Sequence, residues 1–269
     1  MKQAGLTEES KAAAGPAVKM PDGNEEEETE LEDWEKTEFR GECALLNYLG
    51  QDRSDIQWAT NQICREMAKP TVGSRSKVKR VVRYLVGAES VVWKFSEFEA
   101  ERRRWRLDLH VDSDWAKGED RKSTSGGMVM LEGAGIKHWS RTQKTRALSS
   151  GEAEYYALVS GCAEALGVQS LASDLGYDLE VVVVYTDSDA CRGIASRRGL
   201  GKMRHVELKY LWVQEVVKAG RLRVKRVDGL KNIADHLTKA KSGMEMATIL
   251  KEAAAELRMR DVDRSGRAV

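Results

Sequence analysis

The chain has 269 residues, of which 41% are hydrophobic and 32% are charged, and its net charge at neutral pH is only +1. This composition is typical of a folded globular protein, and it excludes a membrane protein because no apolar run approaches the roughly 18 residues that a spanning helix needs. The N-terminus also lacks the apolar core of a signal peptide, so we expect an intracellular protein, cytoplasmic or nuclear, with no membrane partner.

The first 38 residues differ from the remainder in charge. They carry a net charge of −8, whereas the remaining residues are mildly basic. The stretch NEEEETELEDWEK clusters like charges that cannot collapse onto a core, so we predict that residues 1–38 form a disordered acidic leader. A solubilising tail is the simpler interpretation of this leader, and a specific acidic docking motif is the alternative. The basic remainder permits a nucleic-acid partner without proving one.

Residues 39–100 are predicted to be helical. The stretches FRGECALLNYLG and DIQWATNQICREMAKP place apolar residues at helical spacing, and the second stretch ends at Pro70. A third helix is expected in SKVKRVVRYLVGA, starting after Ser76 and stopping at Gly87. Its valines alternate with lysine and arginine, so one face is apolar and the other basic. That basic face is either an ordinary solvated surface or a surface that contacts phosphates.

From residue 101 the pattern changes to one of strands and helices, and we predict a domain over residues 101–240. Three short runs, RWRLDLHVDSDW, GGMVMLEG and IKHWSR, indicate an antiparallel meander. A long helix follows, capped by Ser149 or Ser150 and ending at Gly176. The stretch VVVVYT is typical of a central strand covered on both faces. Two helices, the strand RLRVKRV and a helix at NIADHLTKA come next, and residues 241–269 are expected to form a helical tail.

Acidic side chains follow two of the predicted strands. Asp112 follows LDLHV and Asp187 follows VVVVYT. Ligands of α/β sheets gather at the carboxyl ends of strands, so these two carboxylates should meet, and a divalent cation would offset their repulsion. Glu154 borders the apolar face of the long helix, and Asp235 lies one turn after Asn232. An all-oxygen cluster of this kind suits Mg²⁺.

Several blocks of the sequence together resemble one protein family. HVDSDWAKGEDRKSTSGG, KTRALSSGEAEYYALVSG, VVYTDSDACRGIA, RHVELKY and NIADHLTKA resemble successive blocks of the ribonuclease H domain of copia-type retrotransposon Pol polyproteins, in the same order. Residues 39–100 resemble the end of the reverse transcriptase region of the same polyproteins. The resemblance implies a ribonuclease H-like α/β fold. Such a fold has a mixed five-stranded sheet, made of a three-strand antiparallel meander plus two further strands, flanked by helices and preceded here by a small helical segment.

The resemblance also implies an activity and a set of metal ligands. The activity is metal-dependent endonucleolytic hydrolysis of the RNA strand of RNA/DNA hybrids, and the partners are the hybrid and the remainder of a retrotransposon polyprotein. Two Mg²⁺ ions about 4 Å apart, with Mn²⁺ as a substitute, would clamp the scissile phosphate. The family's four catalytic and metal-binding carboxylates fall on Asp112, Glu154, Asp187 and Asp235. Of the neighbouring acids, Asp114 and Glu152 are expected to lie outside this set.

A second group of residues is predicted to contact the substrate. Its members bring charge or hydrogen-bonding groups to the expected groove: Arg121, Lys122, Ser123, Thr124, Asn232 and His205. Ordinary polar turns explain the loop residues equally well, and a packing role explains His205 equally well. The loop VDGLKN before Asp235 contains no histidine, which departs from the cellular ribonuclease H pattern and leaves a general acid unassigned.

Two absences narrow the function. The sequence contains no Y-x-D-D motif, so we do not expect polymerase activity, and no G-x-S-x-G elbow of a serine hydrolase. A non-catalytic, nucleic-acid-binding fragment of a decayed retrotransposon is the alternative to an active nuclease. The four intact acids favour the nuclease, whereas the acidic leader and the shortened polymerase region favour the fragment.

Overall fold

The structure is a computed structural model that describes residues 10–17, 28–95, 104–118, 120–201 and 203–260. The chain divides into two compact units. The first comprises Met1–Val92, Lys239–Lys251 and Ala255–Val269, and the second comprises Trp93–Thr238 and Glu252–Ala254. Among the described residues no helix is long and apolar enough to cross a membrane. Much of the predicted leader, residues 1–9 and 18–27, lies outside the described residues.

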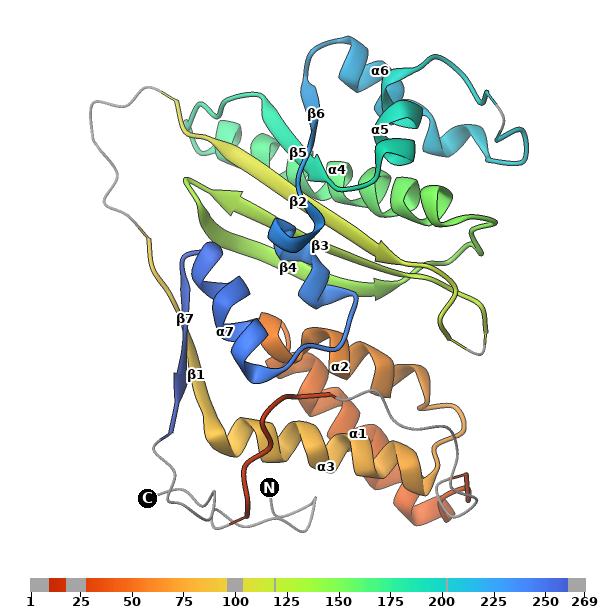
Figure 1. Cartoon of the computed structure of the whole chain (residues 1–269), viewed down its shortest axis with the longest axis vertical. Helices are drawn as coiled ribbons and strands as arrows, with labels where there is room; N and C mark the ends of the chain where they lie inside the picture. The colour runs from red at the N-terminus through yellow and green to blue at the C-terminus, as the bar shows by residue number, and fades with distance from the viewer. Residues whose placement is uncertain (1–9, 18–27, 96–103, 119, 202, 261–269) are drawn as a thin grey trace. The chain divides into compact units, whose positions relative to one another are not determined.

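The first unit contains the predicted helical segment (Figure 1). Its elements are α1 (Asp33–Leu49), α2 (Ser54–Arg65), α3 (Val72–Gly87), α7 (Gly243–Glu252), and a two-stranded sheet of β1 (Ala88–Trp93) with β7 (Ala255–Met259). Fully buried side chains of α1, α2 and α3, among them Phe39, Ile56 and Tyr84, form one core. The two strands were not predicted. Residues 241–269 were expected to be helical, but α7 is followed by β7, which pairs with β1, and residues 261–269 lie outside the described residues.

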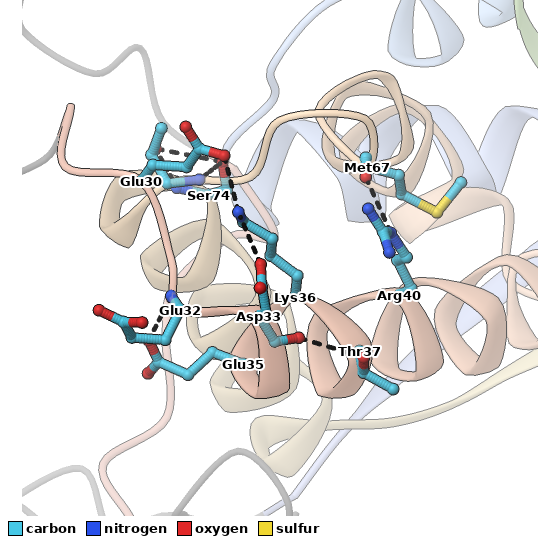
Figure 2. A network of polar contacts seen from close by, with 10 residues as sticks. Glu30, Glu32, Asp33, Glu35, Lys36, Thr37, Arg40, Met67 and Ser74 are labelled. Carbon is cyan, nitrogen blue, oxygen red and sulfur yellow. Dashed lines mark hydrogen bonds and ion pairs between the residues drawn. The ribbon is translucent and has the colours of Figure 1, made fainter.

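Helix α1 starts at Asp33, earlier than the predicted boundary at residue 39. Figure 2 shows the contacts that stabilise this start, including the Glu32 backbone N–H, which donates to Glu35 Oε2 at 3.1 Å. Lys36 Nζ lies 2.8 Å from Glu30 and 3.2 Å from Asp33. These contacts offset the local charge repulsion that made a helix here unexpected.

Besides Lys36, a cation from another helix contacts the acidic residues of α1. This cation is Arg75 of α3, which lies 2.6 Å from Glu35 and 2.8 Å from Glu38, so it joins α3 to the acidic turns of α1. Arg40 Nε donates to the Met67 carbonyl at 3.1 Å and joins α1 to the end of α2 (Figure 2). The end of the acidic segment is therefore folded because Lys36, within the segment, and Arg75, far away in the sequence, neutralise its acids.

The second unit is an α/β layer built on a five-stranded sheet (Figure 1). Its elements are β2 (Leu107–Asp114), β3 (Thr124–Leu131), β4 (Ala134–Thr142), α4 (Ser150–Asp174), β5 (Val182–Thr186), α5 (Asp189–Ser196), η2 (Leu208–Tyr210), α6 (Trp212–Lys218), β6 (Leu222–Arg226), η3 (Gly229–Lys231) and η4 (Ile233–Leu237). The strand order is β4-β3-β2-β5-β6. Strands β2, β3 and β4 pair antiparallel, whereas β5 pairs parallel with both β2 and β6. This is the ribonuclease H-like fold, as predicted.

Helix α4 covers one face of the sheet. Leu107, Leu109 and Val111 alternate along β2 and are fully buried in the core that α4 completes. A glycine is needed where helix and strand meet, because a Cβ on Gly161 would lie 2.7 Å from Val111 Cγ1. The Ser149 side chain caps α4 by accepting the N–H of Glu152 at 3.2 Å, which is one of the two caps expected.

Three local predictions for this unit were wrong in detail. Residues 205–220 form the short η2 and α6 instead of one helix, and the segment that begins at NIADHLTKA forms the 3-10 turn η4 instead of an α-helix. Strand β5 was expected to be covered on both faces, but Val183 and Tyr185 are only half-buried. Their face carries an aromatic stack of Tyr185 on His110, with ring centroids 4.8 Å apart.

We expect Gly127→Ala to destabilise the second unit. Gly127 of β3 pairs with Trp139 of β4, and a Cβ at Gly127 would overlap the Trp139 ring. Overpacking of this kind costs about 1–3 kcal/mol in the free energy of unfolding. Gly193→Ala in α5 is the matched control, because no atom lies within 4 Å of the position that a Cβ would take there, and urea denaturation should show equal or higher stability. Equal stability of both variants would contradict the packing argument.

We expect Glu42→Gln to stabilise the first unit at neutral pH. Glu42 is buried, and neither carboxylate oxygen has a hydrogen-bond partner among the described residues. Burial raises the pKa of this carboxyl, with Arg75 opposing the shift. A raised folded-state pKa means that the ionised form destabilises the fold above the unfolded pKa of about 4.3. The gain, about 1 kcal/mol at pH 7, should vanish below about pH 4 in urea denaturation, and a loss at both pH values would refute it.

Candidate active site

Three carboxylates from three different elements converge at one edge of the sheet. Asp112 of β2, Glu154 of α4 and Asp187, the residue after β5, each offer an oxygen, and these oxygens all lie within 4.8 Å of one another. Strands β2 and β5 are adjacent and parallel, with His110 opposite Tyr185, so the residues two positions later reach the same edge. We call Asp112, Glu154 and Asp187 the carboxylate cluster.

Hydrogen bonds hold two members of the cluster in place. Glu154 Oε1 accepts the Ser113 backbone N–H at 3.3 Å, which ties α4 to β2. The Thr238 hydroxyl donates to Asp112 Oδ2. Thr238 was not predicted, and the only signal for it was its position three residues after Asp235 in NIADHLTKA. Groups from strand β2 and from the end of turn η4, which follows β6, thus orient the carboxylate cluster.

Two titratable groups near the cluster are uncharged at neutral pH. Burial lowers the pKa of His110 to about 4, so this imidazole is neutral at pH 7. Burial also raises the pKa of the Cys191 thiol, and the nearby Glu154 carboxylate acts in the same direction. Three carboxylates at these separations repel one another, and their oxygen-only donor set fits a hard divalent cation such as Mg²⁺.

Asp235 does not belong to the carboxylate cluster found among the described residues. Its turn, η4, is nevertheless attached to β2, because the Asn232 amide donates to the Val111 carbonyl at 2.9 Å. Asn232 also caps η4 by accepting the Ala234 N–H at 3.2 Å. The role of Asp235 as a fourth metal ligand therefore stays a prediction. The Asn232 side chain, predicted to contact the substrate, is buried and makes two hydrogen bonds within the protein.

The two neighbouring acids have partners away from the cluster. Asp114 Oδ1 accepts the Thr124 N–H at 2.6 Å across the β2–β3 pair. Glu152 is 2% exposed and accepts the Tyr156 hydroxyl at 2.6 Å. Its other oxygen lies 2.8 Å from His205 Nε2, a contact that the sequence did not predict. His205 was predicted to contact the substrate. One of its ring nitrogens contacts Glu152, and its side chain is 44% exposed.

The predicted substrate-binding loop is split between surface and interior. Ser123 and Thr124 are 0% exposed, so neither can touch a substrate in this conformation. The Ser123 hydroxyl instead accepts the Ala116 N–H at 3.2 Å and shapes the turn. Arg121 is exposed and Lys122 half-buried, so both remain candidates for phosphate contacts. Strand β3 begins at Thr124, earlier than the run GGMVMLEG indicated.

The fold and the carboxylate cluster define the second unit as a ribonuclease H-like domain. No protein-family model matches the chain. It is 32% identical over 233 residues to the retrovirus-related Pol polyprotein from transposon RE2 of Arabidopsis thaliana, covering 86% of this chain and 16% of that polyprotein. It is 30% identical over 189 residues to the one from transposon TNT 1-94 of Nicotiana tabacum, covering 70% and 14%. The relatives of this chain are Pol polyproteins of copia-type retrotransposons, as predicted, and the chain spans between about a seventh and a sixth of their length.

Some solved structures are distantly similar to this chain. A crystal structure of LC11-RNase H1 in complex with RNA/DNA hybrid is 20% identical to this chain, with a TM-score of 0.33 over 49% of this chain and 92% of that one. The N-terminal RNase H domain of a Mycobacterium tuberculosis protein is 19% identical, with a TM-score of 0.32 over 55% of this chain and 99% of that one. The fold assignment stands on the strand order and strand directions described above.

We expect the effect of Asp187→Asn on stability to change sign with divalent cation. In a chelator the variant should unfold at higher urea concentration than the wild type, because it removes one of three repelling charges. With Mg²⁺ at about a hundred times its Kd, the wild type should gain about 2.7 kcal/mol and the variant much less. Asp189→Asn is the control, because Asp189 is exposed and pairs with Arg192 at 2.7 Å. If the Asp187→Asn effect has the same sign in both conditions, the three carboxylates do not share a cation.

Proposed function

We propose that this chain is a ribonuclease H that hydrolyses the RNA strand of RNA/DNA hybrids with Mg²⁺ as its cofactor. The single observation that carries the proposal is the convergence of Asp112, Glu154 and Asp187 within 4.8 Å at one edge of the sheet. Kinship with retrotransposon Pol polyproteins supports a nucleic-acid substrate. A carboxylate cluster alone is common on protein surfaces, but this one is built from three elements of a ribonuclease H-like fold.

The proposed roles follow from the contacts of each side chain. Asp112, Glu154 and Asp187 would hold the cation, with Asp235 as a fourth carboxylate by family resemblance. When bound, such cations activate a water for attack and stabilise the leaving oxygen. Thr238 donates to Asp112 and Ser113 donates to Glu154, so these two groups fix the carboxylates before any cation binds.

Substrate binding is proposed for the surface beside the cluster. Arg121 is exposed and Lys122 half-buried, and we propose that both neutralise phosphates of the hybrid, a contact that sets position and not sequence. Discrimination of RNA from DNA would come from contacts to 2′-hydroxyl groups, which only the RNA strand carries. His205 keeps one ring nitrogen available beyond its contact with Glu152, so it remains a proposed substrate contact.

One observation favours the alternative of a non-catalytic, nucleic-acid-binding protein. The Asp235 carboxylate is not among the clustered oxygens of the described residues. If a fourth ligand is required and does not reach the cluster, the chain would bind hybrid without cutting it. The two functions therefore differ in cleavage and not in binding.

We expect purified chain to shorten the RNA strand of an end-labelled RNA/DNA hybrid with Mg²⁺, and to leave the RNA intact with a chelator or when the substrate is duplex DNA. Asp187→Asn should lower the cleavage rate by about a hundredfold or more, because a charged ligand is lost without loss of core volume. Asp189→Asn, two residues away and outside the carboxylate cluster, should cleave at the wild-type rate.

Each outcome of this assay separates the two functions. Binding of hybrid by gel shift without metal-dependent loss of RNA establishes the non-catalytic alternative. Equal cleavage by Asp187→Asn and the wild type would mean that the reaction occurs at another site, and the assignment of the carboxylate cluster would be wrong.

A further inference from the structure

The first unit contains a cavity that the nuclease proposal does not use. It has a volume of about 580 Å³ and lies between α2 and α3, with Pro16 and Ala17 at its edge. This volume is in the range of sites for nucleotide-sized ligands. Trp58, Ala59 and Ile63 supply an apolar wall, and the remaining lining side chains are mostly polar or charged.

Three side chains that line the cavity each carry a buried donor with no acceptor among the described residues. These donors are the Trp58 indole N–H, the Gln62 amide nitrogen and the Arg80 Nε. A buried donor without a partner is destabilising, so three side chains of this kind around one cavity favour a ligand that carries acceptor oxygens or ring nitrogens. An apolar ligand would leave this cost in place.

The charge of the cavity selects an anion. Its lining includes the four cations Lys77, Lys79, Arg80 and Arg83 and a single acid, Glu66. Lys77 Nζ lies 2.5 Å from Glu66 Oε1, so that pair is internally neutralised and the other three cations set the net charge. These cations belong to the basic face of α3, which the sequence left open between a solvated surface and a phosphate-contacting surface.

We infer that this cavity binds one nucleotide unit of a single-stranded nucleic acid. The phosphate interacts with Lys79, Arg80 and Arg83, and the base packs against the Trp58 ring. An indole face beside cations is the combination that single-strand binding sites use, whereas a duplex would keep its bases stacked and out of reach. The inference concerns the first unit and does not depend on the carboxylate cluster.

The test measures fluorescence anisotropy of labelled oligo(dC) with the full chain, in chelator and with Asp187→Asn as the background, so that cleavage cannot interfere. We expect Arg80→Gln and Trp58→Leu each to weaken binding about tenfold, and Trp58→Phe to stay within about threefold because a flat ring is kept. Lys69→Gln is the control for charge, because Lys69 is exposed in the same unit and does not line the cavity. It should change the affinity less than about twofold.

Circular dichroism and thermal melting of each variant verify that it folds. If Trp58→Leu does not fold, the binding affinities of Arg80→Gln and Trp58→Phe decide the question. Equal binding by Arg80→Gln and Lys69→Gln would overturn the inference, because the cation effect would then be general. Displacement of oligo(dC) by an acidic peptide at equal concentration would also overturn it and mark the cavity as a protein-binding site. Cleavage of hybrid in the nuclease assay is a separate readout, so either proposal can fail alone.

Discussion

The pairing of β5 with β2 in parallel is the constraint on which the candidate site depends. It places Asp187 beside Asp112, although the two residues are far apart in the chain, and α4 brings Glu154 to the same edge. The arrangement is costly by itself because three carboxylates repel at short range. It persists because the strands and α4 are joined by a core of fully buried side chains, so the repulsion cannot relax without exposing apolar surface. A site that stores repulsion in this way favours a divalent cation as its partner.

A 3-10 turn of the second unit orients one side chain of the carboxylate cluster. Asp112 receives its hydrogen bond from Thr238, and Thr238 follows the 3-10 turn η4. That turn is attached to β2 through the Asn232 amide and the Val111 carbonyl. Leu237 and Thr238 lie over Gly126, where any side chain would collide with them. The glycine in β3 therefore lets the turn approach the strand closely enough to reach Asp112, which links a backbone requirement to the geometry of the site.

The two units differ in how their charged side chains are arranged. In the first unit, acids of α1 are neutralised by Lys36 and by Arg75 from α3, so a segment that looks unfit for folding becomes a helix. The same α3 keeps other cations around a cavity with unmatched donors. In the second unit, acids from three elements are brought together at one edge of the sheet. One helix thus serves both to stabilise its neighbour and to present charge for a ligand, and the two kinds of site call for ligands of opposite sign.

Local patterns in the sequence determined the antiparallel meander, the central strand beside it and the three acids that meet, because alternation, helical spacing and strand-end position are local properties of the chain. The ribonuclease H-like fold was implied by the resemblance of several sequence blocks to one family. The sequence could not decide the Glu152–His205 contact, the burial of Ser123 and Thr124, or the Thr238 bond to Asp112, since each depends on the register of strands and on turns that no local pattern encodes. The β1–β7 pair was missed for the same reason, and the start of α1 depends in part on Arg75 of α3. Partners distant in the sequence supplied this charge and the strand pairing, and only the tertiary structure brings such partners together.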